Sequence, residues 1–275
     1  MAKLLWSPSQ ERVHSSNMFH FMQWINERHG QSFIRYDQLY RWSVENIADF
    51  WESWWHYAGI KASRAYTTVL DDPAKMPGAR WFEGARLNFA ENLLRYRDER
   101  TALIFYGEDR VRSRITYEQL HSAVAGVAGA LKALGLQAGD RVAGFMPNMP
   151  ETAVAMLAAT SLGASWSSCS PDFGIKGVLD RFGQIQPKVL FTADGYYFKS
   201  RRLDCLERVA RITRQIPSLL KTVVVPYTAT GPDIHDIDSG ILYDDFISDA
   251  PAGDIEFTQL PFDHPLYIMY SSGTT

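Results

Sequence analysis

Cysteine and long apolar runs are scarce in this sequence. Its 275 residues include only Cys169 and Cys205, which excludes a disulfide framework and a CxxC metal pair, so we expect two reduced thiols. The longest stretches of small apolar residues, 123–134 and 153–162, are far shorter than a membrane-spanning helix. The first residues also lack the apolar run of a signal peptide. These absences predict a cytoplasmic protein.

A charge excess of either sign is also missing. Lysine and arginine number 28 against 31 aspartate and glutamate residues, so the net charge is −3. This balance creates no strong field for nucleic acid or for an anionic membrane, and we expect neither as a partner. Hydrophobic residues make up 46% of the chain, enough for a globular protein with a sizeable core. The oligomeric state stays open.

Aromatic residues are distributed unevenly along the chain. Seven of the eight tryptophans precede residue 82, and Trp166 is the exception. This shift separates an aromatic-rich, helical leader from a more ordinary α/β region. We place the boundary in the charged run at 96–100, and therefore predict a leader over residues 1–96 and a second domain over residues 97–275.

Two helices are predicted in the leader. Ser15 or Ser16 can cap the first and Gly30 can end it, whereas the second follows Ser43. We interpret the aromatic stripe of the second helix as core packing rather than as a ligand pocket. The apolar stripes consist of Met18, Phe21, Met22 and Ile25 in the first helix, and of Val44, Ile47, Phe50, Trp51, Trp54 and Ala58 in the second.

Strands and helices alternate after residue 100. Thr116 and Gln119 have the spacing of a capping box at the start of one helix, and Pro150 suits the first turn of another. The alternation predicts an α/β fold with a mostly parallel sheet flanked by helices, whose ligands bind at the carboxyl ends of the strands. Residues 228–240 are predicted to form a surface loop. The other expected elements are strands at 102–106, 112–117, 141–146, 164–168, 189–192, 222–225 and 267–270, and helices at 176–186 and 203–216.

A cluster of small polar residues follows the last expected strand, at Ser271, Ser272, Gly273, Thr274 and Thr275. Backbone N–H groups and hydroxyls in such a cluster can surround phosphate oxygens, and glycine lets the backbone approach closely. The cluster lacks the GxxxxGK[ST] spacing of a P-loop, and an ordinary turn is the alternative interpretation.

No residue in the chain is assigned to catalysis or to metal binding. None of the seven histidines has the spacing of metal ligands, and His264 is assigned to a loop beside Pro265. Asp140 follows Gly139 and is explained by turn chemistry rather than by an acid–base role.

Several motifs resemble one enzyme superfamily. Residues 270–275 (YSSGTT) look like the first part of the nucleotide loop of acyl-adenylate-forming enzymes, and 139–142 (GDRV) with 146–151 (MPNMPE) resemble their strand–turn–helix. Residues 81–92 (WFEGARLNFAEN) are similar to the entry segment of the acetyl-CoA synthetase branch. Residues 166–174 (WSSCSPDFG) and 178–190 (VLDRFGQIQPKVL) are similar to acetoacetyl-CoA synthetases.

This resemblance implies an acid–thiol ligase that uses ATP and coenzyme A as substrates and Mg²⁺ as an activator. A carboxylate, acetoacetate in the narrow interpretation, would attack ATP to give an acyl-adenylate and pyrophosphate, and the CoA thiol would then displace AMP. Ser271 to Thr275 would hold the β- and γ-phosphates. Residues 1–96 would be a leader of the acetyl-CoA synthetase type, and residues 97–275 an incomplete AMP-binding domain.

The resemblance also implies a CoA site. Phe173 lies where acetyl-CoA synthetases place a turn against CoA, although Ser-Pro-Asp-Phe replaces their Phe-Gly-Gly. Lys199, Arg201 and Arg202 lie where arginines contact the CoA phosphates, and clustered cations suit such a phosphate. The alternative is a solvated basic face that continues through Arg208, Arg211 and Arg214.

Two other functions remain open. The first is a ligase for another short acid, such as acetate or propionate, and the second is a non-catalytic nucleotide-binding fragment. Because the sequence stops inside the expected phosphate loop, we expect this chain by itself to be inactive. We also expect marginal stability, since sheet edges would lie open.

Overall fold

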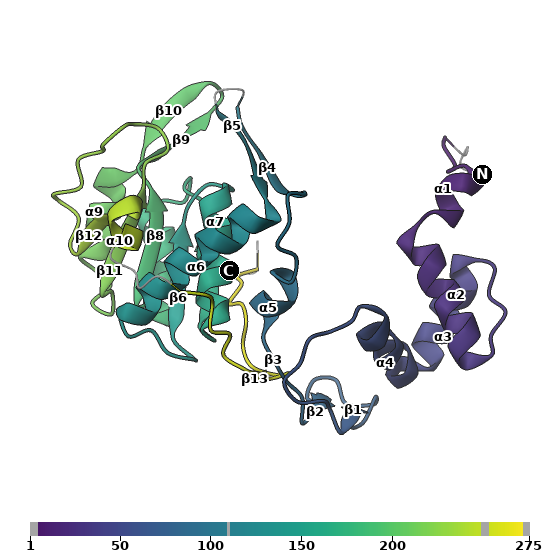
Figure 1. Cartoon of the computed structure of the whole chain (residues 1–275). Helices are drawn as coiled ribbons and strands as arrows, with labels where there is room; N and C mark the ends of the chain where they lie inside the picture. The colour runs from purple at the N-terminus through teal and green to yellow at the C-terminus, as the bar shows by residue number, and fades with distance from the viewer. Residues whose placement is uncertain (1–4, 109–110, 249–252, 272–275) are drawn as a thin grey trace. The chain divides into compact units, whose positions relative to one another are not determined.

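A computed structural model describes residues 5–108, 111–248 and 253–271 (Figure 1). The contacts divide the chain into two compact units, the first ending at Ala85 and the second beginning at Arg86. The domain division predicted at residues 96–97 stays a prediction. None of the helices in the described ranges is long and apolar enough to cross a membrane.

From residue 5 onward, the first unit consists of four helices and one strand pair. Helix α2, which is the first of the two helices predicted from the sequence, begins as predicted. The Ser16 hydroxyl accepts a hydrogen bond from the N–H of Phe19 at 3.2 Å, and the helix ends at Gly30 in a left-handed conformation. Phe21 is 2% exposed within the core of this unit. The elements are α1 (Gln10–His14), α2 (Asn17–His29), α3 (Tyr36–Glu45), α4 (Ile47–Tyr57), and the antiparallel strands β1 (Thr68–Leu70) and β2 (Trp81–Glu83).

The helix predicted to follow Ser43 is wrong in its start and in its buried face. Ser43 lies inside α3, where its hydroxyl donates to the carbonyl of Tyr40, and the helix breaks at Asn46 with φ −126° and ψ 59°. Only Val44 of the predicted stripe lies before the break. The buried residues of α4 are Ser53 and Trp55, and Phe50 is partly buried against the core. Trp51 and Trp54 are 41% and 42% exposed. Met18, predicted for the core of the first helix, is also exposed.

A five-stranded parallel sheet forms the centre of the second unit, as predicted. Its order is β12-β11-β8-β6-β7, and every pair is parallel. All five residues of β8 are buried, which is typical of a parallel sheet with both faces covered. The strands are β6 (Arg141–Phe145), β7 (Ser165–Cys169), β8 (Val189–Ala193), β11 (Lys221–Val225) and β12 (Gly240–Leu242), of which β12 was not predicted.

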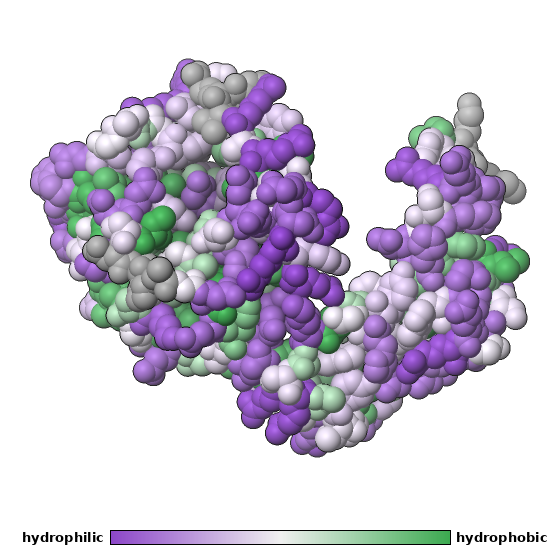
Figure 2. All heavy atoms as spheres, viewed as in Figure 1, coloured by the Kyte–Doolittle hydropathy of each residue, from purple (hydrophilic) through white to green (hydrophobic). Residues whose placement is uncertain are grey.

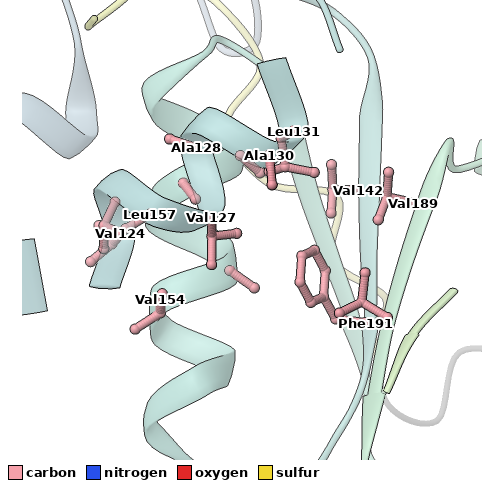
Figure 3. Close-up of a cluster of buried hydrophobic side chains, with 14 of the residues drawn as sticks. Val124, Val127, Ala128, Ala130, Leu131, Val142, Val154, Leu157, Val189 and Phe191 are labelled. Carbon is pink, nitrogen blue, oxygen red and sulfur yellow. The ribbon is translucent and has the colours of Figure 1, made fainter. Parts of the chain in front are cut away.

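Successive strand residues point to opposite faces and build two cores. Val189 and Phe191 of β8 pack with α6 and α7, whereas Leu190 between them packs with α8 and α9 (Figure 3 shows the first of these cores). The capping box of Thr116 and Gln119 begins α6 as predicted. The helices of this unit are α5 (Phe89–Leu93), α6 (Tyr117–Ala133), α7 (Pro150–Ser161), α8 (Ile175–Ile185), α9 (Leu206–Thr213) and α10 (Tyr243–Ser248).

The described part of the second unit also contains three two-stranded sheets. The predicted hairpin is present as β4 (Thr101–Gly107) and β5 (Val111–Thr116), and β3 (Arg86–Leu87) pairs with β13 (Leu260–Pro261). The third was not predicted: β9 (Gly195–Phe198) pairs antiparallel with β10 (Arg201–Asp204). The helix predicted at 203–216 therefore starts later, at Leu206.

The strand predicted at 267–270 is also wrong. A single parallel bridge joins Tyr267 to Trp166, since the N–H of Trp166 donates to Leu266 and the N–H of Ile268 donates to Trp166. The segment is thus extended beside β7 without forming a continuous ladder. Residues 228–239 contain no helix or strand, as predicted for a loop.

The face of the molecule drawn in Figure 2 is mostly hydrophilic, with hydrophobic residues scattered over it.

Candidate functional site

The carboxyl ends of the parallel strands define the candidate site. Because all strands of this sheet run in the same direction, the residues that follow β6, β7, β8 and β11 emerge at one edge. The 266–268 segment runs parallel to β7, so it delivers Tyr270 and Ser271 to the same edge. Ser271 is exposed there. Ser272, Gly273, Thr274 and Thr275 lie outside the described residues.

Asp194 is a fully buried carboxylate directly after β8. It accepts hydrogen bonds from the N–H of Tyr227 at 2.7 Å, from the N–H of Thr228 at 2.9 Å and from the Thr228 hydroxyl at 2.8 Å. These bonds hold the turn after β11 against the end of β8. Sequence analysis missed this residue, because its partners lie 33 and 34 positions later and no local motif marks them.

The predicted CoA-binding cations lie on the β9–β10 hairpin. Lys199 and Ser200 form its tip with φ of 50° and 62°, and the Glu108 carboxylate accepts both of their N–H groups at 3.0 and 2.8 Å. Arg202 Nε donates to the Thr228 hydroxyl at 3.0 Å, so the Asp194 turn also orients Arg202. A side chain at Gly195 would meet the carbonyl oxygen of Leu203 at 2.5 Å, which explains the glycine.

These cations differ in how firmly the described contacts hold them. Arg201 and Arg202 are neighbours on one strand and therefore point to opposite faces of the hairpin. Lys199 is exposed, with its ammonium 5.4 Å from the ring centre of Phe198. Arg202 alone of the three has a described side-chain hydrogen bond that leads back to the sheet.

Phe173 lies in a second cluster at the end of β7. The Arg181 guanidinium lies over the Phe173 ring at 4.6 Å and over the Tyr270 ring at 5.4 Å. The Tyr270 hydroxyl donates to the Arg181 carbonyl at 2.7 Å. The structure therefore joins one predicted CoA residue to the residue that precedes Ser271. Sequence analysis did not single out Arg181, which is 89 positions away from Tyr270.

Both cysteines are free and buried near this edge. Burial raises the pKa of Cys169 and of Cys205 to about 11, so both remain neutral thiols near pH 7. Neutral, buried thiols are poor nucleophiles and poor metal ligands. Their environment explains why we assign them to the core.

Asp140 and His264 have structural partners. The Asp140 carboxylate accepts the N–H of Gln137 at 2.8 Å and pairs with Lys188 at 2.7 Å. His264 Nε2 lies 2.8 Å from the carbonyl oxygen of Gly163. Within the described ranges, no group of three or more histidine, cysteine or acidic side chains is placed to hold a metal ion.

Comparison with known proteins defines the class. The family described as "AMP-binding enzyme" matches residues 89–275, and "Acetyl-coenzyme A synthetase N-terminus" matches residues 36–93. The parallel sheet and the polar segment delivered to its carboxyl edge lie within the first match. The chain belongs to the AMP-binding enzyme family.

Particular relatives narrow this class. The chain is 46% identical over 272 residues to the acetoacetyl-coenzyme A synthetase of Rhizobium meliloti (strain 1021), covering 98% of this chain and 41% of the relative. It is 39% identical over 288 residues to a malonamoyl-CoA synthetase of Penicillium aethiopicum, covering 99% of this chain and 39% of that protein.

One solved structure is also similar to this chain over its whole length. The structure of acetoacetyl-CoA synthetase from Streptomyces lividans matches with a TM-score of 0.91 and 38% identity, over 100% of this chain and 42% of that one. The chain thus spans about two fifths of the length of the relatives that it matches.

Proposed function

We propose that this chain is the amino-terminal part of an ATP-dependent ligase that converts acetoacetate to acetoacetyl-CoA. The observation that carries the proposal is the similarity to the Rhizobium meliloti enzyme, which extends over 98% of this chain at 46% identity. An acetoacetate carboxylate oxygen attacks the α-phosphorus of ATP, and pyrophosphate leaves. The CoA thiol then attacks the acyl carbon of the adenylate, and AMP leaves.

In this proposal, Ser271 to Thr275 bind the β- and γ-phosphates through backbone N–H groups and hydroxyls. Mg²⁺ would neutralise charge on the ATP phosphates when it is bound with the nucleotide. Phe173, Lys199, Arg201 and Arg202 form the CoA-binding part, with Arg202 held by the Thr228 hydroxyl. No residue of the chain is assigned to a proton transfer. The cytoplasmic location and the domain limits, 1–96 and 97–275, also stay predictions.

A second candidate substrate has a specific argument in its favour. The Penicillium aethiopicum relative is named for malonamoyl-CoA, and its similarity also covers 99% of this chain. Malonamate and acetoacetate differ only by an amino group in place of the methyl group beside the carbonyl distant from the carboxylate. A hydrogen-bond acceptor in the acyl pocket, facing the amino group, would favour malonamate, whereas an apolar pocket would favour acetoacetate.

The test is pyrophosphate release by the full-length gene product with ATP, Mg²⁺ and CoA. Acetoacetate, malonamate, acetate, propionate and butyrate are offered in turn at equal concentration. We expect the highest kcat/KM for acetoacetate. A higher kcat/KM for another acid would support the ligase mechanism but contradict acetoacetate as the substrate. No pyrophosphate release with any of the five acids would favour a non-catalytic nucleotide-binding protein.

A further inference from the structure

Tyr270 is the last residue before the polar cluster, and it contacts both the main chain and the side chain of Arg181. Its hydroxyl donates to the main-chain carbonyl of Arg181 at 2.7 Å, and its ring lies 5.4 Å from the Arg181 guanidinium. Burial raises the pKa of Tyr270 above its ordinary value, so the phenol remains protonated and able to donate at neutral pH.

Arg181 is itself anchored on α8. Its Nη1 donates to the carbonyl of Gly177 one turn earlier at 2.8 Å, and its guanidinium lies 4.6 Å from the Phe173 ring centre. A Cβ at Gly177 would lie 3.1 Å from Phe173 Cδ1, so the glycine leaves room for this ring. Arg208 of α9 donates to the Phe173 carbonyl at 3.3 Å, a second contact that holds the Phe173 turn.

No carboxylate of the described residues pairs with the Arg181 guanidinium. The neighbouring acid, Asp180, pairs instead with Lys176 at 2.6 Å. A half-buried guanidinium between two aromatic rings therefore keeps its charge uncompensated at the edge where Ser271 emerges. Cation–π contact with both rings stabilises it there.

Several contacts hold the chain beside β7 ahead of Tyr270. They include the bridge at Trp166, the hydrogen bond from the Ser167 hydroxyl to the Ile268 carbonyl at 2.8 Å, and that from the Tyr267 hydroxyl to Met156 Sδ at 3.2 Å. The contacts with Arg181 are thus the last described side-chain anchor before the polar cluster. Moving Tyr270 would move the start of that cluster with it.

We propose that Arg181 is a positioning residue, which through Tyr270 places the beginning of the phosphate-binding segment for ATP and ties it to the Phe173 turn. The inference rests on the proposed function for the identity of the ligand. It assigns to Arg181 a role in ATP binding but no contact with the reacting atoms.

Two variants of the full-length gene product test the role. Tyr270→Phe keeps the ring and removes the hydroxyl, and Arg181→Lys keeps the charge and removes the planar stack. We expect each to raise the KM for ATP by about tenfold, the effect of one lost hydrogen bond or stacking contact, and we expect Tyr270→Phe to leave the KM for CoA within about twofold. Matched controls are Tyr66→Phe, which removes another hydrogen-bonded hydroxyl, and Arg211→Lys on an exposed face.

The outcomes separate a positioning role from a structural one. An unchanged KM for ATP in both variants would overturn the inference. So would an equal rise in the KM of all substrates together with a lower Tm, because that pattern indicates general loosening of the fold.

Direct binding separates this inference from the proposed function. If the wild-type protein releases no pyrophosphate with any acid, calorimetry with ATP and Mg²⁺ still tests Arg181. About tenfold weaker ATP binding in both variants, with the two controls unchanged, would support the inference. Equal affinity in all proteins, or no ATP binding by the wild type, would overturn it.

Discussion

The two units of this chain bury their apolar side chains in different ways. The first unit packs aromatic residues from short helices around Phe21, whose ring centre lies 4.9 Å from that of Tyr57 and 5.3 Å from that of Trp54. The second unit packs aliphatic residues on both faces of a parallel sheet. In the covered sheet all of β8 is buried, whereas the short helices leave aromatic residues such as Trp51 and Trp54 about two fifths exposed. The difference predicts that the two units respond to different perturbations.

The largest expected effects come from a matched pair of core substitutions. Phe182→Ala in the second unit and Phe21→Ala in the first each remove a ring that is at most 2% exposed, and each should cost about 3–5 kcal/mol of unfolding free energy in its own unit. Tryptophan fluorescence reports the first unit, since seven of the eight tryptophans precede residue 82. Far-UV circular dichroism reports the whole chain and is dominated by the larger second unit.

Denaturation followed by both signals then sharpens the comparison. Phe21→Ala should shift the fluorescence transition more than the dichroism transition, and Phe182→Ala should do the opposite. Equal shifts of both signals in both variants would mean that the chain unfolds as one cooperative body.

Asp194→Asn is expected to give the next largest effect. The amide cannot accept from all three donors of Tyr227 and Thr228, so buried N–H or O–H groups lose their partner at a cost of about 3 kcal/mol. Urea denaturation followed by circular dichroism measures the loss. Exposed Asp245→Asn is the control and should change stability by less than about 0.5 kcal/mol. A stability equal to that of the control would contradict a structural role for this carboxylate.

Asn88→Ala should have a somewhat smaller effect in the same unit. The Asn88 amide nitrogen donates to the carbonyls of Thr160, Ser161 and Thr258, and its oxygen caps α5. Loss of the cap and of these bonds should cost about 2 kcal/mol in the urea experiment. Asn17→Ala, an exposed position in α2, is the matched control. If both variants unfold at the same urea concentration, the buried amide contributes nothing.

The smallest expected effect depends on pH. His121 is 7% exposed, and burial, with Arg97 as a further cause, lowers its pKa below the ordinary value of 6.5, although Asp254 opposes the shift. The unfolded chain therefore binds a proton before the folded chain does, and stability is lost as pH falls below about 6.5 toward the lower folded pKa. His121→Asn should remove this part of the pH dependence between pH 7 and 5. An identical slope in the variant would show that another group titrates.

Asp71 in the first unit gives a pH dependence that differs from that of His121. Lys75 and the N–H groups of Arg80 and Asp72 bond to Asp71 and hold its pKa well below the ordinary value. The contribution of Asp71 to the free energy of unfolding is fully present above about pH 3.9, the pKa of aspartate in the unfolded chain. It is lost only as the pH falls further. Fluorescence should therefore detect no loss from Asp71 between pH 7 and 5, while dichroism detects the loss from His121.

Local signals in the sequence predicted the elements whose causes are local. The cap at Ser16, the capping box of Thr116 and Gln119 and the stop at Gly30 each act within four residues, and the structure confirms them. The β9–β10 hairpin was missed, because the Leu203–Ile216 pattern has a helical period and the Lys199–Ser200 turn that joins the two strands contains no glycine.

The candidate site was predicted less completely than the fold. Phe173, Lys199, Arg201 and Arg202 were selected by resemblance, and their roles stay proposals. Asp194 and Arg181 were not selected at all, although the first holds the turn that orients Arg202 and the second contacts Phe173 and Tyr270.

By itself, the sequence determined the parallel α/β fold of the second unit, because apolar periodicity and helix caps depend on residues that are close in the chain. Its motifs also pointed to the enzyme family that the comparisons support. The tertiary structure decided which side chains meet at the carboxyl edge of the sheet. Tyr270 and Arg181 are 89 positions apart and Asn88 and Thr258 are 170 apart. Contacts over such distances form only when the whole sheet and its helices pack, so no local pattern encodes them.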